Sequence, residues 1–495
     1  MNRTVLPRPA SYPLVAAAFV LLTATPALAE LRLASALSAV PAGAPAVAPE
    51  NDRHPSAGRV LAASDVGADG ARANPAGRLT LAQALQMALE RNDQFALSFE
   101  QVEQARSALL ESRAPLGPSA QLTASQANLT TNLRAQGFPS LPGGQILFPT
   151  LNGPFNSFDA RLTLSQAVFD PARRHLARAS EGQVGEAEHQ RLALRDQLLD
   201  MVALAYIAAQ QTQATLESAQ ANLALSRELA QLASDQQHNG LATGVDVARA
   251  QTRVAQDQFA VTQARSDQAQ ALLRLKRIIG LGVDDPLALA APLAYQPRRL
   301  PGLAEALQHA MERRQELLVQ EARVHAAEEG VLAAESEGMP VVSVSAAVGP
   351  SGVTPSQTVY LTRSIGIGVS VPLYTNGLLD AHRGRAKSLV RAAEIARSDT
   401  RHQIEEDVQL ALVALATAEE QVAVTTTTVS LSDRLLELAR DRFKAGVADN
   451  LEVLDALTSN TSARSRLIEA TAGYSAARVN LDAAMGDVAG LLQLP

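Results

Sequence analysis

The residue types that carry out catalysis or bind metals are sparse in this sequence and lack the spacing that such chemistry requires. Eight histidines are present, and none belongs to an HxxxH or HExxH arrangement. Cysteine is absent, which excludes thiolate metal sites and disulfides. The chain has no GxxxxGK(S/T) or GxSxG motif, and Gly366-x-Gly368 lacks the third glycine of a dinucleotide-binding loop. We therefore predict a protein that is not an enzyme and uses no metal or cofactor.

Three carboxylates lie where two helical segments are predicted to begin. The segments TGVD (243–246) and DNLE (449–452) occupy equivalent positions in a repeated unit, and both have the spacing of a capping box. The helix dipole also favours acidic residues in a first turn, so capping can account for Asp246 and Glu452. Asp455 lies one turn further along, where capping does not explain it. It is therefore the first candidate for a carboxylate with a functional role.

The two turns belong to a unit that occurs twice in the chain. Three pairs of segments correspond: LAQALQMALER (81–91) with LAEALQHAMER (303–313), LTLSQAVFDPA (162–172) with IGVSVPLYTNG (367–377), and GLATGVDVARA (240–250) with GVADNLEVLDA (446–456). Each copy is predicted to contain a short helix, a helix, a strand, a loop, a strand, a very long helix, a tight turn and a long helix.

The repeats define the domain organisation. Residues 1–29 combine a basic start, an apolar run and Ala27-Leu28-Ala29, which is typical of a cleaved secretory signal. Residues 30–78 are rich in Ala and Pro and are predicted to form a flexible linker. The first repeat is expected over 79–290 and the second over 291–495. A formal charge of -7 without a long basic run argues against a nucleic-acid partner.

The long helices are too long for a compact core. They are predicted over about 171–239 and 245–280 in the first copy, and over about 376–445 and 450–490 in the second. At 1.5 Å per residue the first of them is about 100 Å long. Mostly apolar residues recur every seven positions from Val247 to Leu275 and from Val453 to Leu481, and one polar residue interrupts each row, Gln268 in the first and Asn460 in the second. This spacing predicts helices that pack side by side as coiled coils.

Four strands alternate between apolar residues and small or polar ones. They are predicted over about 119–128 and 158–169, and over about 341–349 and 363–373. In SIGIGVSV (364–371) the isoleucines and valines share one face, and Gly and Ser share the other. Strands of this length can cross a bilayer, but four cannot close a barrel and an open edge is forbidden in lipid. Several chains would have to pool their strands, unless the strands belong to a soluble sandwich.

These features resemble the TolC-type outer-membrane efflux protein family. The resemblance rests on the duplicated LxxALxxAxxR opening, the SQAVFDPARR and SVPLYTNG strand-to-helix junctions, and the NGLATGVDV and AGVADNLEVLDA turns, and it extends from Leu79 to Leu492. It implies a mostly helical homotrimer with a small β part. In that fold a 12-stranded β-barrel in the outer membrane of a Gram-negative bacterium continues into a 12-helix α-barrel in the periplasm. The implied function is a passive exit duct for drugs, toxic compounds or metal ions, working with a periplasmic adaptor (membrane fusion protein) and an inner-membrane pump.

The resemblance also implies roles for individual residues. The far helical turns form the periplasmic mouth of the family, and Asp455, Glu452 and Asp246 match its acidic gate positions. The turn residues expected to contact the adaptor are Gly240, Leu241, Ala242, Thr243, Gly446, Val447, Ala448 and Asp449. In some relatives a Tyr and an Arg help to tie the mouth shut, and here Phe443 and Ala448 stand there. Phe169 and Tyr374, at equivalent strand ends, suit an aromatic belt at the membrane interface with outer-membrane lipid.

Other interpretations stay open at this stage. The duct could serve type I protein secretion instead of efflux. A periplasmic coiled-coil adaptor is a second alternative, although it would carry one helical hairpin flanked by β-rich domains; a secreted structural protein built from long helices is a third. Basic residues just past the strands either touch lipid phosphates or form a solvated helix face: Arg173, Arg174, His175 and Arg178 in the first copy, and His382, Arg383, Arg385 and Lys387 in the second.

Overall fold

The computed structural model describes residues 78–133, 135, 151–240, 242–445, 447 and 449–488. The predicted signal segment and all of the predicted linker except its last residue lie outside this part of the chain. The turn residues Leu241, Gly446 and Ala448 lie outside it too.

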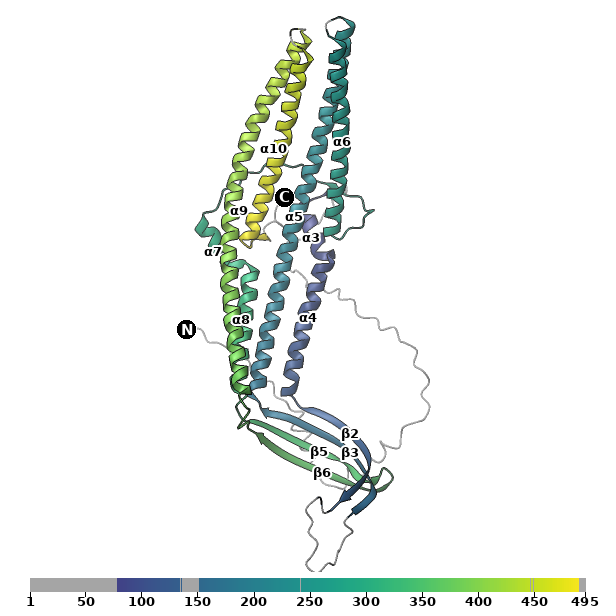
Figure 1. The fold of residues 1–495 in the computed structure, drawn as a ribbon, viewed down its shortest axis with the longest axis vertical. Coiled ribbons are helices and arrows are strands. Elements are labelled where there is room, and N and C mark those ends of the chain that lie inside the picture. The colour runs from purple at the N-terminus through teal and green to yellow at the C-terminus, as the bar shows by residue number, and fades with distance from the viewer. Residues whose placement is uncertain are drawn as a thin grey trace, which may run out of the picture. The chain divides into compact units, whose positions relative to one another are not determined.

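The elements follow the predicted order in both copies, and the chain is mostly helical with a small β part (Figure 1). The first copy contains α3 (Leu81–Arg91), α4 (Asp93–Arg113), the 3-10 turn η1 (Ala114–Leu116), β2 (Ser119–Asn132), β3 (Leu151–Phe169), α5 (Pro171–His238) and α6 (Gly244–Ile278). The second contains α7 (Leu303–Arg313), α8 (Gln315–Ser336), β5 (Val341–Thr354), β6 (Gln357–Ser370), α9 (Leu378–Lys444) and α10 (Asn450–Ala484). Two short strands that were not predicted, β1 (Arg78–Leu79) and β4 (Ala288–Leu289), pair in parallel.

The main sheet has the strand order β2-β3-β5-β6, with every neighbouring pair antiparallel. Each copy therefore supplies one hairpin, and β3 and β5 join the two hairpins at the centre. Among the described residues, β2 and β6 have no strand on their outer sides. The backbone groups along these two edges are available to another chain.

Several element ends differ from the sequence prediction. β2 continues to Asn132 and β3 begins at Leu151, and β5 and β6 likewise extend further towards their shared turn than predicted. The prediction followed side-chain alternation, whereas the backbone ladder continues through polar residues. β6 ends at Ser370, shortly before Pro372, which has no N–H to donate. α10 ends at Ala484 instead of near 490 because Gly486, with φ +72°, turns the chain away.

The long helices begin and pack as their sequences require. The Asp170 side chain accepts a hydrogen bond from the Arg173 N–H (3.0 Å), and proline occupies the first turn of the 68-residue α5. The α5/α6 and α9/α10 hairpins project in the same direction from the sheet, and α4 and α8 lie beside the sheet-proximal halves of α5 and α9 (Figure 1). The residues of the two seven-residue rows are buried or partly buried. The predicted coiled-coil seams are therefore the packed faces of α6 and α10.

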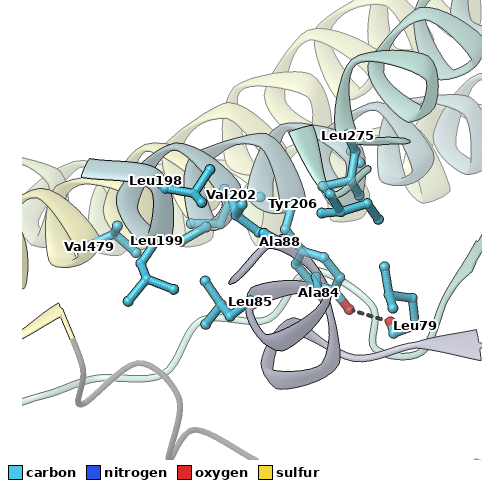
Figure 2. Close-up of a cluster of buried hydrophobic side chains, with 14 of the residues drawn as sticks. Leu79, Ala84, Leu85, Ala88, Leu198, Leu199, Val202, Tyr206, Leu275 and Val479 are labelled. Atoms are coloured by element: carbon cyan, nitrogen blue, oxygen red, sulfur yellow. Dashed lines mark hydrogen bonds between the residues drawn. The ribbon is translucent and has the colours of Figure 1, made fainter. Parts of the chain in front are cut away.

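Small side chains let the short helix of the first copy approach α5 closely. Ala84, Leu85 and Ala88 of α3 are fully buried against an α5 surface that includes Leu199 and Val202 (Figure 2). The buried Tyr206 hydroxyl donates a hydrogen bond to the Leu79 carbonyl (3.0 Å), which satisfies its polar atom and fixes the start of the repeat. A second cluster around Ala306, Ile404 and Tyr474 occupies the corresponding place in the second copy.

Candidate functional site

The four-stranded sheet has two chemically distinct faces that continue across all strands. Leu122 pairs with Leu162, Leu162 with Val348, and Val344 with Ile367, so apolar side chains line one side. We call this side the apolar face; it comprises Ala120, Leu122, Ala124, Phe158, Ala160, Leu162, Leu164, Val342, Val344, Ala346, Val348, Ile365, Ile367 and Val369. The opposite side, the polar face, comprises Gln121, Thr123, Ser125, Thr163, Ser165, Ser343, Ser345, Gly366, Gly368 and Ser370.

The outer strands of the apolar face are exposed. Leu122 in β2 is 74% exposed and Ile367 in β6 is 75% exposed. A contiguous apolar surface of this kind marks contact with lipid or with another protein. At the helix-proximal end the sequence-predicted aromatics are also exposed, Phe169 at 40% and Tyr374 at 85%. A bulge between Ala167 and Phe169 places Phe169 opposite Val342, on the apolar face.

The turn between α5 and α6 uses its carboxylate as a cap. α5 ends before Gly240, whose φ of +75° allows the chain to reverse. Thr243 accepts from the Asp246 N–H (3.3 Å), and the Asp246 carboxylate accepts from the Thr243 N–H (2.9 Å) and hydroxyl (2.6 Å). These hydrogen bonds hold the pKa of Asp246 below its usual 3.8. The Asp246 carboxylate is thus used structurally, as part of a complete capping box. Ala242 beside it is half-buried.

The turn between α9 and α10 is built differently. The Asp449 side chain accepts from the Glu452 N–H (3.2 Å), so the cap itself is present. The Glu452 carboxylate does not return to the cap and instead pairs with the Arg442 guanidinium at 2.6 Å. Asp455 is exposed, and its carboxylate has no hydrogen bond or ion pair with any residue that the structure describes. Val447 at the tip of the turn is also exposed.

Contacts between the two turns hold the hairpins together. Asn450 is completely buried, and its side-chain amide donates to the Asp246 backbone carbonyl (2.9 Å). The equivalent residue of the first copy is Gly244, and this difference is the one signal in the sequence that could have pointed to Asn450. The Gln236 side chain donates to the Phe443 carbonyl (2.8 Å), and the Phe443 ring is buried with Val453 and Leu457. Phe443 therefore acts here through apolar packing and not through a hydroxyl.

The basic residues just past the strands mostly pair with acids of the same chain. Arg173 contacts Asp170 (3.1 Å) and Arg383 contacts Asp380 (3.3 Å). His175 and His382 each lie 2.7 Å from a glutamate, Glu329 and Glu337 respectively, and Lys387 lies 3.4 Å from Glu335. Arg174 instead stacks 5.9 Å from the Phe169 ring centroid. These pairings favour a solvated helix face over a cluster reserved for lipid phosphates.

A groove where α8 begins and α10 ends contains polar groups that the sequence did not single out. It has a volume of about 1060 Å³ and is lined by α5, α8, α9 and α10. Arg314 bridges Asp407 (2.7 Å) and Glu316 (3.1 Å) within it. Burial raises the pKa of Asp200, whose Oδ1 has no hydrogen-bond partner among the described residues. Its burial depends on which helices are neighbours, so no local pattern could have revealed it.

Comparison with known proteins agrees with this architecture. The sequence matches the family described as outer membrane efflux protein over residues 84–281 and 306–487, which is most of the chain. Protein CyaE of Bordetella pertussis is 28% identical over 334 residues, covering 66% of this chain and 70% of CyaE. The alkaline protease secretion protein AprF of Pseudomonas aeruginosa is 27% identical over 334 residues, covering 66% of this chain and 69% of AprF.

The fold is also found among solved structures. The crystal structure of a membrane protein from Pseudomonas aeruginosa superposes with a TM-score of 0.71 and 21% identity, covering 82% of this chain and 93% of that one. At this sequence identity the similarity supports the fold alone.

Proposed function

The chain belongs to the outer membrane efflux protein family, and on that basis we propose that it is the exit duct of a tripartite efflux system. Its substrates would be small molecules such as drugs, toxic compounds or metal ions, passed on by an inner-membrane pump and a periplasmic adaptor. The family consists of outer-membrane channel proteins, not enzymes. The observation that carries the proposal is a two-faced sheet with open edges at the base of two long helical hairpins.

The functional unit in this proposal is a homotrimer with a 12-stranded β-barrel and a 12-helix α-barrel. The two free edges, β2 and β6, would pair between copies, which satisfies the backbone groups that lipid cannot satisfy. Exposed Leu410, Val413 and Leu431 on α9 support packing against a neighbouring helix. α9 is also the one described helix that is long and apolar enough by composition to cross a membrane, and only 28% of its most apolar stretch is buried in a single chain. We assign it to the contact between copies.

The helical turns are proposed as the periplasmic mouth and as the adaptor contact. The adaptor would meet the tips around Gly240 and Val447. Three copies of Asp455 and Glu452 would bring six carboxylates towards one axis, and such a ring attracts cations and repels anions. Asp246 contributes less to this ring because its carboxylate is engaged by Thr243.

Single-channel recording tests the role of the mouth. We expect Asp455→Asn combined with Glu452→Gln to lower the preference for cations over anions. Asp246→Asn is the matched control, because it removes one acid from the equivalent turn of the other copy, and it should change selectivity much less. Unchanged selectivity in the double variant would remove both residues from the pore.

Deletion of the gene tests the function as a whole. We expect the deletion strain to become more susceptible to small toxic compounds. In the strain that expresses the protein, we expect it to co-purify from outer-membrane fractions with an adaptor and a pump. Recovery of the mature protein as a water-soluble monomer would contradict the proposal.

Protein secretion is the second candidate function, favoured by the similarity to AprF, whose name assigns it to secretion of alkaline protease. In that case the deletion strain would retain a normally secreted protein while its susceptibility to small compounds stays unchanged.

A further inference from the structure

One charged side chain interrupts the apolar face of the sheet. Arg363 in β6 pairs with Val348, two positions from Ile365 and on the same side of the strand. Arg363 is the one charged residue that β2, β3, β5 and β6 place on the side of the apolar face, although the uncharged polar residues Gln126 and Gln166 also lie on it. Arg363 is exposed and makes no hydrogen bond or ion pair with the residues that the structure describes. A cation in this position requires a counter-charge when the face is covered by lipid.

The strands that the structure describes offer no counter-charge to Arg363. Residues 338–376, which span β5, β6 and their turn, contain no acidic residue, and residues 114–169 contain only Asp159. Asp159 belongs to the polar side, where it pairs with Arg161 at 2.8 Å. In a closed ring β6 would lie beside β2 of the next copy, and Ser119–Asn132 also lacks an acid. The described strands therefore supply no anion to pair with Arg363, and a head group of the surrounding lipid is the occupant that we consider.

The position of Arg363 along the strand indicates which anion is available. Arg363 precedes Tyr374 by eleven residues, and Phe158 precedes Phe169 by eleven. At about 3.3 Å per residue and a strand tilt of about 40°, the eleven residues from Phe158 to Phe169 within β3 rise about 28 Å, close to the roughly 25 Å apolar band of a transmembrane barrel. If Tyr374 and Phe169 lie at the periplasmic interface, then Arg363 and Phe158, at equivalent positions of the two copies, lie at the outer one. An arginine there reaches the head-group layer with its guanidinium.

We propose that Arg363 binds a phosphate group of a phosphorylated lipid in the outer leaflet of the outer membrane. This inference rests on the proposed function, because it requires lipid on the apolar face. A guanidinium is suited to the task, since it can donate two parallel hydrogen bonds to one phosphate and keeps its charge at every physiological pH. With one Arg363 per copy, a trimer would hold three such lipids, each beside the seam where β6 of one copy meets β2 of the next.

Binding of lipid A by the purified full-length protein tests the proposal. Phosphatidylcholine nanodiscs containing bisphosphorylated lipid A are compared with nanodiscs containing the same lipid A after enzymatic removal of its phosphates, and retained lipid is counted by native mass spectrometry. We expect the wild-type protein to retain the phosphorylated form and Arg363→Gln to bind it about tenfold more weakly, as loss of one charge-assisted contact implies. Arg363→Lys keeps the positive charge but lacks the two parallel N–H donors of a guanidinium, so its affinity for the phosphorylated lipid should be intermediate. Arg161→Gln, an arginine of the same sheet on the polar side, is the matched control and should bind as wild type.

Equal retention by wild type and Arg363→Gln would overturn the proposal, and so would equal retention of phosphorylated and dephosphorylated lipid A by the wild type. Should Arg363→Gln fail to assemble, the Arg363→Lys variant and the two lipids on the wild type still decide the matter. Added inorganic phosphate should not displace the lipid; displacement would assign the site to free phosphate. Conductance of the same samples separates the two hypotheses: a channel that inserts and conducts but ignores lipid phosphate refutes this inference and leaves the exit-duct function standing.

Discussion

The turns of the two copies occupy equivalent places in the fold, yet they use their carboxylates differently. In the first copy the Asp246 carboxylate closes a complete capping box with Thr243. In the second the equivalent Glu452 binds Arg442, and Asp455, which has no partner among the described residues, replaces the Arg249 of the first copy. At these two turns both helix starts are capped by a side chain, whereas the charge one turn further along differs. The duplicated turns therefore keep the capping role of equivalent residues and not the role of their carboxylates.

At the short helices that open the repeats, the two copies differ in the cap itself. α3 is capped by a reciprocal Thr80/Gln83 box, whereas α7 begins at Gly302 without a side-chain cap. Leu85 of α3 is fully buried, and its equivalent Leu307 in α7 is only partly buried. The short helix α3 of the first copy is thus held more tightly than its equivalent α7 in the second copy.

Truncating these two leucines is the strongest way to test that difference. Leu85→Ala is expected to cost about 2–5 kcal/mol of unfolding free energy, because it removes buried methyl groups and leaves a cavity. Leu307→Ala should cost clearly less, since part of that side chain already contacts solvent. The thermal unfolding midpoints of the detergent-solubilised variants give the comparison. Equal losses would show that the two repeats are equally well anchored.

Removing the turn carboxylates tests whether the first copy depends on its acid for structure. Asp246→Ala should destabilise the α5/α6 tip by about 1 kcal/mol, whereas Glu452→Ala should change the α9/α10 tip by a few tenths. Hydrogen exchange of the backbone amides at each tip measures both effects.

The stabilisation by Asp246 should also depend on pH. The pKa of Asp246 in the folded protein lies below 3.8, so its contribution is fully present above that value and is lost as the pH falls through the folded pKa. A tip whose exchange rates do not respond to acid below 3.8 would contradict the capping role.

Much of the fold could be predicted because it follows from local rules. The order of elements, the Asp170 cap, the glycine at the end of α5 and the two-faced strands all depend on residues close together in the sequence. The alternation predicted which side chains share a face, and the strand pairing confirms this for all four strands. Where the strands end was predicted less well, since backbone pairing continues through polar residues that carry no alternation.

The candidate site was less accessible to prediction because its decisive contacts join separate segments. Arg442 and Glu452 stand on opposite sides of a turn, so their pairing depends on how α9 and α10 meet. Asn450 is explained only by its contact with the Asp246 carbonyl of the other copy. In the sequence Asp200 has the pattern of an ordinary acid on a helix surface, and only the fold shows that α8 and α10 lie beside it. The roles of Asp455 and Glu452 at a pore stay predictions.

The smallest expected change in stability comes from breaking the Arg442–Glu452 pair. The same substitution tests whether the Glu452 carboxylate of the second copy contributes to ion selectivity. The side chains of both partners are substantially exposed, at 57% and 38%, so Arg442→Ala should cost at most about 0.5 kcal/mol and less at high salt. Its effect on the proposed mouth should be larger, because it releases the Glu452 carboxylate from its neutralising partner. We expect Arg442→Ala to increase cation selectivity in single-channel recordings, and Arg442→Ala combined with Glu452→Gln to return it to near the wild-type value. If Arg442→Ala leaves selectivity unchanged while Asp455→Asn lowers it, Glu452 lies outside the conduction path and Asp455 alone distinguishes the second turn from the first.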